Sequence, residues 1–477
     1  MKGRTATSLS WNAVSMLVVT FCQLIQLLVL ARLFSPHEFG IASIILIYIG
    51  FSQTFIDGGL SNAIIQKQST TLEQLSSLFW FGVVIGAALS ISTFIIAPSI
   101  AVFFKYQPFS DFIRLISPTF VISSFGIHFR ALYEKNITFA IPCIVDITTT
   151  IIQTVATLTF AIMGLGAISI VYGFLIRSLL ASVALVYFGC KFHYVPSFVL
   201  NIHKIKSHIQ FGLFELGNKS INYFSANIDK LLIGKMIGMQ SVGIYNLAWQ
   251  FVIFPVTKLI PIINKVALPI YSRQSSHPEV MARSYSYTIR LSSFVTIPAL
   301  TFLSFNSHEL IQIIYGDFWK QTADVISVLA YLAMFKVIAN PGGTLLLALG
   351  RADLCFWWNL VWSLVVLMFL YIVLYQIPNI EVIAPTLLVL SMTIGMLWHV
   401  MIFKVSKVNY WPIIKYLVWC FLIAHVSAFI VGLIVNKFTM ASSPTILLVK
   451  LILFVSTYSF ISFVFRASLN LSHSLKR

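Results

Sequence analysis

Long apolar stretches separated by short polar turns run through the whole chain. A helix that spans the hydrocarbon core of a bilayer, about 30 Å thick, needs roughly 20 mostly apolar residues, and many stretches here reach that length. We identify fourteen of them, at 9–33, 39–65, 74–98, 110–133, 141–163, 166–188, 209–234, 242–270, 286–305, 322–348, 354–376, 381–403, 411–436 and 444–465. The pattern predicts an all-α polytopic membrane protein with about 14 transmembrane helices.

Lysine and arginine are distributed unevenly between the two sets of loops. With a cytoplasmic N-terminus, the inner loops and tails carry sixteen of these residues and the outer loops carry five. Cytoplasmic loops of membrane proteins hold the excess of basic residues. The distribution predicts a multi-pass protein of the bacterial cell inner membrane, with an even number of spans and both termini cytoplasmic.

Composition supports this interpretation. Of the 477 residues, 58% are hydrophobic and 9% are charged, whereas soluble domains carry about 25% charged residues. The net charge of +17 could indicate a nucleic-acid binder, but the basic residues are scattered between apolar segments and form no basic run. We therefore exclude a soluble fold and expect no nucleic-acid partner.

A short motif recurs at an offset of 203 residues. Arg32-Leu-Phe-Ser-Pro-His-Glu-Phe-Gly40-Ile41 aligns with Lys235-Met-Ile-Gly-Met-Gln-Ser-Val-Gly243-Ile244. Because six helices separate the two copies, both enter the membrane from the same side, as in parallel repeats. The repeat predicts two parallel six-helix lobes at 1–190 and 209–405, a cytoplasmic loop between them at 191–208, and an extra helix pair with a cytoplasmic tail at 406–477.

The same offset superposes two polar stripes. Asn12, Ser15 and Gln26 of the first span fall on Glu215, Asn218 and Asp229 of the seventh span. Their spacing keeps each set on one helical face, and Lys219 and Asn222 extend the second stripe. Two facing polar stripes predict a lumen between the lobes, although such residues also hydrogen-bond helices together in lipid.

Eight ionisable residues fall deep within the predicted spans. They are Asp57, Asp146, Arg177, Glu215, Lys219, Lys258, Lys265 and Lys336. Each costs roughly 2.5–3.5 kcal/mol at the centre of a spanning helix, and the excess of cations over anions would be balanced by an anionic ligand. Lys219, Lys258 and Lys336 are the first candidates to face that ligand. Alternatively they pair with Glu215, Asp57 or backbone carbonyls and lock the lobes together, while Lys265 and Asp146 snorkel to the inner face.

Motifs that hold cofactors or metals are not visible in the sequence. We find no glycine-rich phosphate loop, no HExxH motif and no zinc spacing, and the ten histidines form no ligand cluster. We therefore expect no catalytic residue, no metal and no cofactor. No loop exceeds about twenty residues, too few for an ATPase domain, so transport would draw on a proton or sodium gradient or on the gradient of the substrate.

Several motifs occur in a characteristic order between residues 8 and 360. They are Phe39-Gly-Ile41, the run from Asp57 to Gln66, Phe129-Arg-Ala-Leu-Tyr-Glu-Lys135, Ser220-Ile-Asn-Tyr223, Gly243-Ile-Tyr-Asn-Leu-Ala248, Asn340-Pro-Gly-Gly343 and Gly350-Arg-Ala-Asp353. In order and spacing they resemble the Wzx-type polysaccharide transporter (oligosaccharide flippase) family of the MOP exporter superfamily. The likeness is greatest to colanic acid and O-antigen unit exporters.

This resemblance implies a MATE-like fold in which two helical bundles alternate between inward-open and outward-open forms. It also implies a substrate: an oligosaccharide repeat unit linked through diphosphate to undecaprenol, flipped from the cytoplasmic to the periplasmic leaflet. Membrane lipids and the glycan polymerase machinery would be its partners. The last hundred residues add little to the resemblance.

From these observations we assign expected roles. Lys219, Lys258 and Lys336, with Lys265 and Arg177, would bind the diphosphate or acidic sugars. Asn12, Gln26, Asn222 and Asp229 would hydrogen-bond glycan hydroxyls, and Asp57 and Glu215 are candidates for ion coupling. All of these residues lie within the predicted spans.

Other functions stay open at this point. A lipid II flippase or a MATE-type drug exporter would share the fold, and a simple lipid scramblase or channel would share the apolar helices. A membrane-embedded glycan polymerase or ligase would need a sizeable catalytic outer loop. The largest outer loop here, about 306–321, has only Glu309 and Asp317 as acids.

Overall fold

A computed structural model describes residues 2–57, 59–67, 70–406, 408–438 and 444–466. These residues form helices joined by turns, and no strand occurs among them. Their contacts divide the chain into two compact units, Met1–Gly243 and Ile244–Arg477. The expected all-α class is confirmed.

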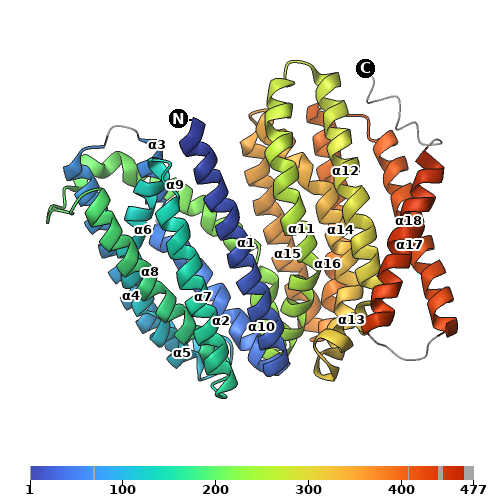
Figure 1. Cartoon of the computed structure of the whole chain (residues 1–477), viewed down its shortest axis with the longest axis horizontal. Coiled ribbons are helices and arrows are strands. Elements are labelled where there is room, and N and C mark those ends of the chain that lie inside the picture. Colours follow the sequence, from blue (N-terminus) through green and yellow to red (C-terminus); the bar gives the residue numbers. More distant parts are fainter. Residues whose placement is uncertain (1, 58, 68–69, 407, 439–443, 467–477) are drawn as a thin grey trace. The chain divides into compact units, whose positions relative to one another are not determined.

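The first unit contains ten helices within its described residues. They are α1 (Lys2–Leu33), α2 (Pro36–Asp57), α3 (Leu60–Gln66), α4 (Leu72–Phe103), α5 (Phe109–Ile116), α6 (Pro118–Lys135), α7 (Ala140–Ile162), α8 (Ile168–Phe192), α9 (Ile202–Ser225) and α10 (Ile228–Met236). Helices α1, α7, α8, α6 and α4 pack in that order, each against the next (Figure 1). Leu78, Phe79, Phe129 and Ile205 pack together in a buried core between α4, α6 and α9.

Local sequence signals explain where these helices begin and end. Thr71 and Gln74 form a reciprocal capping box at the start of α4, with Thr71 Oγ1 accepting from the Gln74 amide at 3.3 Å. Pro118 occupies the first turn of α6, where its missing N–H costs nothing, and it separates α6 from α5. The predicted helix 39–65 is wrong at its end: α2 stops at Asp57, and Gly59 adopts φ of 67° before α3 begins.

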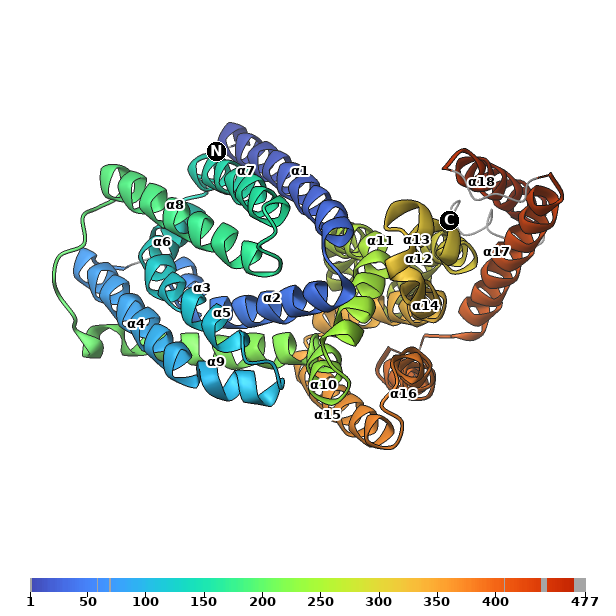
Figure 2. The same cartoon turned by 90° about the horizontal axis from the view of Figure 1, so that it is seen from below.

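Helix α11 (Met239–Arg273) begins in the first unit and continues into the second. The second unit then contains α12 (Pro278–Phe305), α13 (Ser307–Ile314), α14 (Lys320–Ala348), α15 (Ala352–Gln376), α16 (Ile383–Ser406), α17 (Trp411–Phe438) and α18 (Pro444–Arg466), with 3₁₀ turns at Asp317–Trp319 and Ile380–Val382. Helix α12 packs against α14 and α17, and α17 packs against α18 (Figure 2). The extra helix pair is thereby attached through Phe302, Val431 and Phe454.

Twelve candidate membrane spans occur among the described residues. They match twelve of the fourteen predicted stretches; the other two, 209–234 and 242–270, correspond to α9 with α10 and to α11. The protein is thus a multi-pass membrane protein, and the count of fourteen stays a prediction. Helix α9 packs against α2, α3 and α4 of the first unit, whereas the repeat assigns it to the second lobe; the lobe boundaries also stay a prediction.

Candidate functional site

A cavity of about 1010 Å³ opens within the second unit, between α14, α15, α16 and α17. Aromatic side chains form much of its wall, among them Trp358, Trp362, Trp398 and Tyr410. Polar groups are few, and they come from Lys336, Asn340, Asn359, Ser391 and His399. A largely apolar pocket with a small number of polar groups is the usual form of a binding site for an organic ligand.

Lys336 and Asn340 lie one helical turn apart on α14 and both line this cavity. The Lys336 ammonium lies 4.3 Å from the centre of the Trp249 ring, a cation–π contact. Asn264 donates a hydrogen bond of 2.9 Å from its amide nitrogen to Asn340 Oδ1. These contacts position the Lys336 ammonium and the Asn340 amide at the cavity wall.

Hydrogen bonds also orient the aromatic part of the wall. Trp398 Nε1 donates to the Ala339 carbonyl at 3.0 Å. The Tyr410 hydroxyl lies 3.4 Å from His399 Nδ1 and 3.0 Å from the Tyr285 hydroxyl. Burial raises the pKa of Tyr410 to about 12, so this phenol stays neutral at physiological pH. Among the described residues that line the cavity, Lys336 is the one lysine, and no arginine, aspartate or glutamate is present.

In the first unit, Glu215 and Lys219 form the ion pair that their spacing predicts. Lys219 Nζ lies 3.6 Å from Glu215 Oε1, and Asn62 Nδ2 donates to the same oxygen at 2.8 Å. Both charged side chains are partly exposed, 35% for Lys219 and 27% for Glu215. The contact with Asn62 joins α9 to α3. The Lys219 charge is therefore at least partly balanced within the unit.

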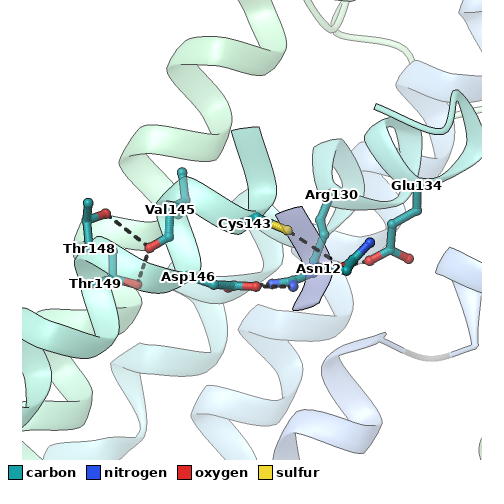
Figure 3. A network of polar contacts seen from close by, with 8 residues as sticks. All are labelled: Asn12, Arg130, Glu134, Cys143, Val145, Asp146, Thr148 and Thr149. Atoms are coloured by element: carbon teal, nitrogen blue, oxygen red, sulfur yellow. Dashed lines mark hydrogen bonds and ion pairs between the residues drawn. The ribbon is translucent and has the colours of Figure 1, made fainter. Parts of the chain in front are cut away.

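A second polar network lies between α6 and α7 (Figure 3). Arg130 Nη1 and Nη2 donate to the two carboxylate oxygens of Asp146 at 3.0 and 2.5 Å, and Arg130 Nε donates to Glu134 at 3.3 Å. This bidentate geometry is the strong form of an arginine–carboxylate pair. The structure thus gives Asp146 a definite partner in place of the expected snorkelling. Sequence reasoning did not pair Arg130 with Asp146, because the two residues lie on different helices.

Arg177 and Asn12 are the predicted site residues that lie near this network. Arg177 Nη1 donates to Gln153 Oε1 at 3.2 Å, from α8 to α7. The Cys143 thiol lies 3.6 Å from Asn12 Oδ1 and joins α7 to α1. Both contacts are within the first unit's own bundle. They give Arg177 and Asn12 structural partners, and their expected roles toward a ligand stay predictions.

The remaining predicted residues lie on several helices, and their roles stay predictions. Asn222 on α9 and Lys265 on α11 are exposed, and Gln26 on α1 is half-buried. Asp229 Oδ1 accepts a 2.9 Å hydrogen bond from the Lys230 amide in the first turn of α10. The side chains of Asp57 and Lys258 lie outside the described residues.

The tryptophans of the cavity are the functional candidates that sequence reasoning missed. Trp357, Trp358 and Trp362 crowd one predicted span together with Asn359, and that density of indoles beside an amide was the available signal. Lys336 was found by its charge alone. Among the described residues, no group of three or more His, Cys, Asp or Glu side chains could hold a metal ion.

Comparison with known proteins adds independent information. A model of the family described as "Polysaccharide biosynthesis protein" matches residues 29–324, more than half of the chain. The teichuronic acid biosynthesis protein TuaB of Bacillus subtilis (strain 168) is 29% identical over 354 residues, which are 73% of this chain and 72% of that protein. The lipopolysaccharide biosynthesis protein WzxC of Escherichia coli (strain K12) is 26% identical over 359 residues, 75% of this chain and 73% of that protein.

Among solved structures, the lipid II flippase MurJ in an inward closed conformation matches with a TM-score of 0.78. The match covers 96% of this chain and 99% of that chain at 16% sequence identity. The TM-score establishes a shared fold, whereas a sequence identity this low leaves the substrate undecided.

Proposed function

Because the chain belongs to the polysaccharide biosynthesis protein family, we propose that it is a flippase for lipid-linked oligosaccharides. Its substrate would be an undecaprenyl-diphosphate-linked repeat unit, carried from the cytoplasmic to the periplasmic leaflet for O-antigen or exopolysaccharide synthesis. The family resemblance inferred from the sequence motifs is confirmed by the family match. The names of the relatives, which concern teichuronic acid and lipopolysaccharide, support a polysaccharide building block as the cargo.

The observation that carries this proposal is the cavity of the second unit. Such a substrate has an apolar chain, an anionic diphosphate and a hydroxyl-rich glycan. The cavity offers indole faces for apolar groups, one ammonium for an anion, and amides for hydroxyl groups. Because Lys336 is the one lysine or arginine among the described lining residues, it is the residue that would attract the diphosphate or an acidic sugar.

Translocation would follow from alternation between inward-open and outward-open forms. Each unit has its own buried core, so each can move as a body while its internal packing is kept. A difference in affinity between the two forms sets the direction of net transport. Glu215 and Asp57 are our candidates for coupling to a proton or sodium gradient, because carboxylates within a membrane bind such ions.

The location of the reaction belongs to the same proposal. An undecaprenyl-linked intermediate is made on the inner face and polymerised outside, so the protein would lie in the bacterial inner membrane with both termini cytoplasmic. The excess of basic residues in the predicted inner loops supports this orientation. The polymerase that consumes the flipped unit would be a functional partner.

The experiment compares cells that lack this protein with cells rescued by wild type, Lys336→Gln or Lys404→Gln. Lys404 is exposed near the end of α16 and does not line the cavity, so it is a matched control for loss of one positive charge. We expect the lipid-linked oligosaccharide to accumulate and surface glycan to be lost without the protein. Wild type and Lys404→Gln should restore both, and Lys336→Gln should restore them poorly.

Unchanged lipid-linked pools and unchanged surface glycan in the deletion would contradict the flippase proposal. Loss of peptidoglycan synthesis with normal surface polysaccharide would indicate a lipid II flippase of the same fold. Increased sensitivity to organic cations alone would indicate a drug exporter. A cationic cavity wall disfavours that last outcome, because it repels cationic ligands.

A further inference from the structure

Two lysines and a histidine lie close together at the end of the first unit where α3, α6 and α9 meet. Lys67, directly after α3, donates from its ammonium to the Ser207 hydroxyl of α9. Lys135, the last residue of α6, donates from its ammonium to the Lys67 carbonyl at 2.6 Å and to Thr70 Oγ1 at 3.3 Å. Three segments distant in sequence are thus joined by lysines. We call Lys67, Lys135 and the neighbouring His208 the basic triad.

His208 is the buried member of the triad. The residue is 1% exposed, and neither ring nitrogen has a hydrogen-bond partner among the described residues. Leaving a buried donor or acceptor unsatisfied destabilises a protein appreciably. Burial, followed by the charges of Lys67 and Lys135, lowers the pKa of His208. The imidazole is therefore neutral at physiological pH and keeps one N–H free to donate to a ligand.

Carboxylates nearby are engaged elsewhere. Glu73 accepts from Lys204 at 2.6 Å, and Glu134 accepts from Arg130 at 3.3 Å. Glu215, two turns further along α9, holds Asn62 and Lys219. Within the described residues no ion pair involves Lys67 or Lys135, so no carboxylate described there neutralises their charges.

We propose that the basic triad binds a phosphate group at this end of the first unit. Each ammonium has three donors, and the hydrogen bonds within the unit use one at Lys67 and two at Lys135. The remaining donors and the His208 N–H can converge on an anion. A bound phosphate would relieve the repulsion between the lysines and satisfy the buried imidazole. This site is separate from the cavity of the second unit and does not depend on the proposed cargo.

The surroundings indicate a membrane lipid as the source of the phosphate. The segment that leads into α9 exposes Val195, Phe198 and Ile202, with 87% of Phe198 accessible. This segment is fixed to the start of α4, because Trp80 Nε1 donates to the Ser197 carbonyl at 3.0 Å and the Asn201 amide donates to Ser77 Oγ at 3.1 Å. Apolar side chains beside a cluster of basic residues suit an anionic membrane lipid, because its headgroup is charged and its chains are apolar.

The test uses the full-length protein, purified in detergent and depleted of lipid. Native mass spectrometry measures binding of phosphatidylglycerol and of phosphatidylcholine with the same acyl chains, and calorimetry measures binding of inorganic phosphate. Wild type should bind phosphatidylglycerol at least about tenfold more tightly than phosphatidylcholine. Lys67→Gln with Lys135→Gln should weaken that binding by about fivefold per lysine, roughly 30-fold in all.

The matched control is Lys404→Gln with Lys415→Gln, which removes two exposed charges near the turn between α16 and α17 and should bind like wild type. His208→Phe is a second test of the site that stays informative if the lysine pair variant does not fold. It fills the site with a ring of similar size and removes the unsatisfied nitrogens, so it should fold normally and still bind the lipid more weakly.

The two ligand arms distinguish the source of the phosphate. Preference for phosphatidylglycerol without a response to inorganic phosphate would assign the site to a lipid headgroup. Binding of inorganic phosphate that the triad variants abolish would support the site with free phosphate as its ligand. Equal binding by wild type, the lysine pair variant and His208→Phe would overturn the proposal, whatever the outcome for oligosaccharide transport.

Discussion

Gly40 and Gly243 pack backbone against backbone at the starts of α2 and α11. The contacts are reciprocal, because each glycine meets the same backbone atoms of the other helix. A β-carbon on Gly40 would lie 3.0 Å from the Gly243 amide nitrogen and overlap the Met239 carbonyl. A β-carbon on Gly243 would lie 3.0 Å from the Gly40 nitrogen and overlap the Pro36 carbonyl. These are the paired positions of the 203-residue repeat, so its two copies contact each other reciprocally.

Gly243→Ala should therefore destabilise the protein. The added methyl group meets backbone atoms that cannot rotate away, and overpacking of this kind costs about 1–3 kcal/mol. We expect a lower melting temperature in detergent and reduced yield of folded protein. Gly432→Ala is the control, because a β-carbon there has no atom within 4 Å and alanine favours the helix. Equal stability of the two variants would show that α2 and α11 do not approach this closely.

Asp146→Ala should destabilise the first unit by about 1–3 kcal/mol, because Arg130 then loses its bidentate partner in a partly buried place. Arg130 is 38% exposed, so solvent reduces the loss. A double-mutant cycle with Arg130→Ala, followed by thermal unfolding in detergent, measures the coupling. Additive effects of the two substitutions would mean that the pair contributes nothing.

Gly395→Phe should block transport without weakening the fold. Gly395 lines the cavity of the second unit, and a β-carbon at this position would meet no atom within 4 Å. A phenyl ring there would occupy space that a substrate needs. Gly432→Phe on α17 adds the same ring at a position with equal space that does not line the cavity. Rescue of surface glycan should fall at least about tenfold for the first variant and stay near wild type for the second; equal rescue would show that the substrate does not use this cavity.

Acidification should lower the stability of the lipid-depleted protein. His208 has a lowered pKa in the folded protein, so the unfolded chain binds more protons as the pH falls through about 6.5. Stability is retained above this value and lost progressively below it. The melting temperature measured from pH 7.5 to 5.5 should fall less in His208→Phe than in wild type. Identical pH profiles would show that His208 is not buried in a neutral form.

The sequence predicted those parts of the fold that follow from the length of the apolar stretches. Twelve predicted spans have counterparts, and the Gly40 and Gly243 motifs found by comparing the chain with itself contact each other. The break after Asp57 was missed, because apolar length indicated one continuous helix; the glycine pair before Leu60 was the available turn signal in the sequence. Hydropathy measures burial in lipid and not the local dihedral angles.

The site was predictable only in part, because charge alone does not reveal partners. Glu215 and Lys219 are close in sequence, so their pairing could be expected from helical spacing. Arg130 and Asp146 are on different helices and meet only through the packing of α6 and α7. Lys336 could be chosen for its charge, but its position beside a tryptophan-lined cavity depends on how α14 to α17 pack.

Translocation by the purified protein in liposomes tests the flippase function itself. An undecaprenyl-diphosphate-linked oligosaccharide is placed in the inner leaflet, and its exposure to a membrane-impermeant glycosidase outside is followed with time. We expect rapid exposure with wild type and with Gly432→Phe, and slow exposure with Gly395→Phe. Exposure no faster than in protein-free liposomes would contradict this function, and so would equally rapid movement of ordinary phospholipids, which would make the protein a scramblase without selection for the glycan carrier.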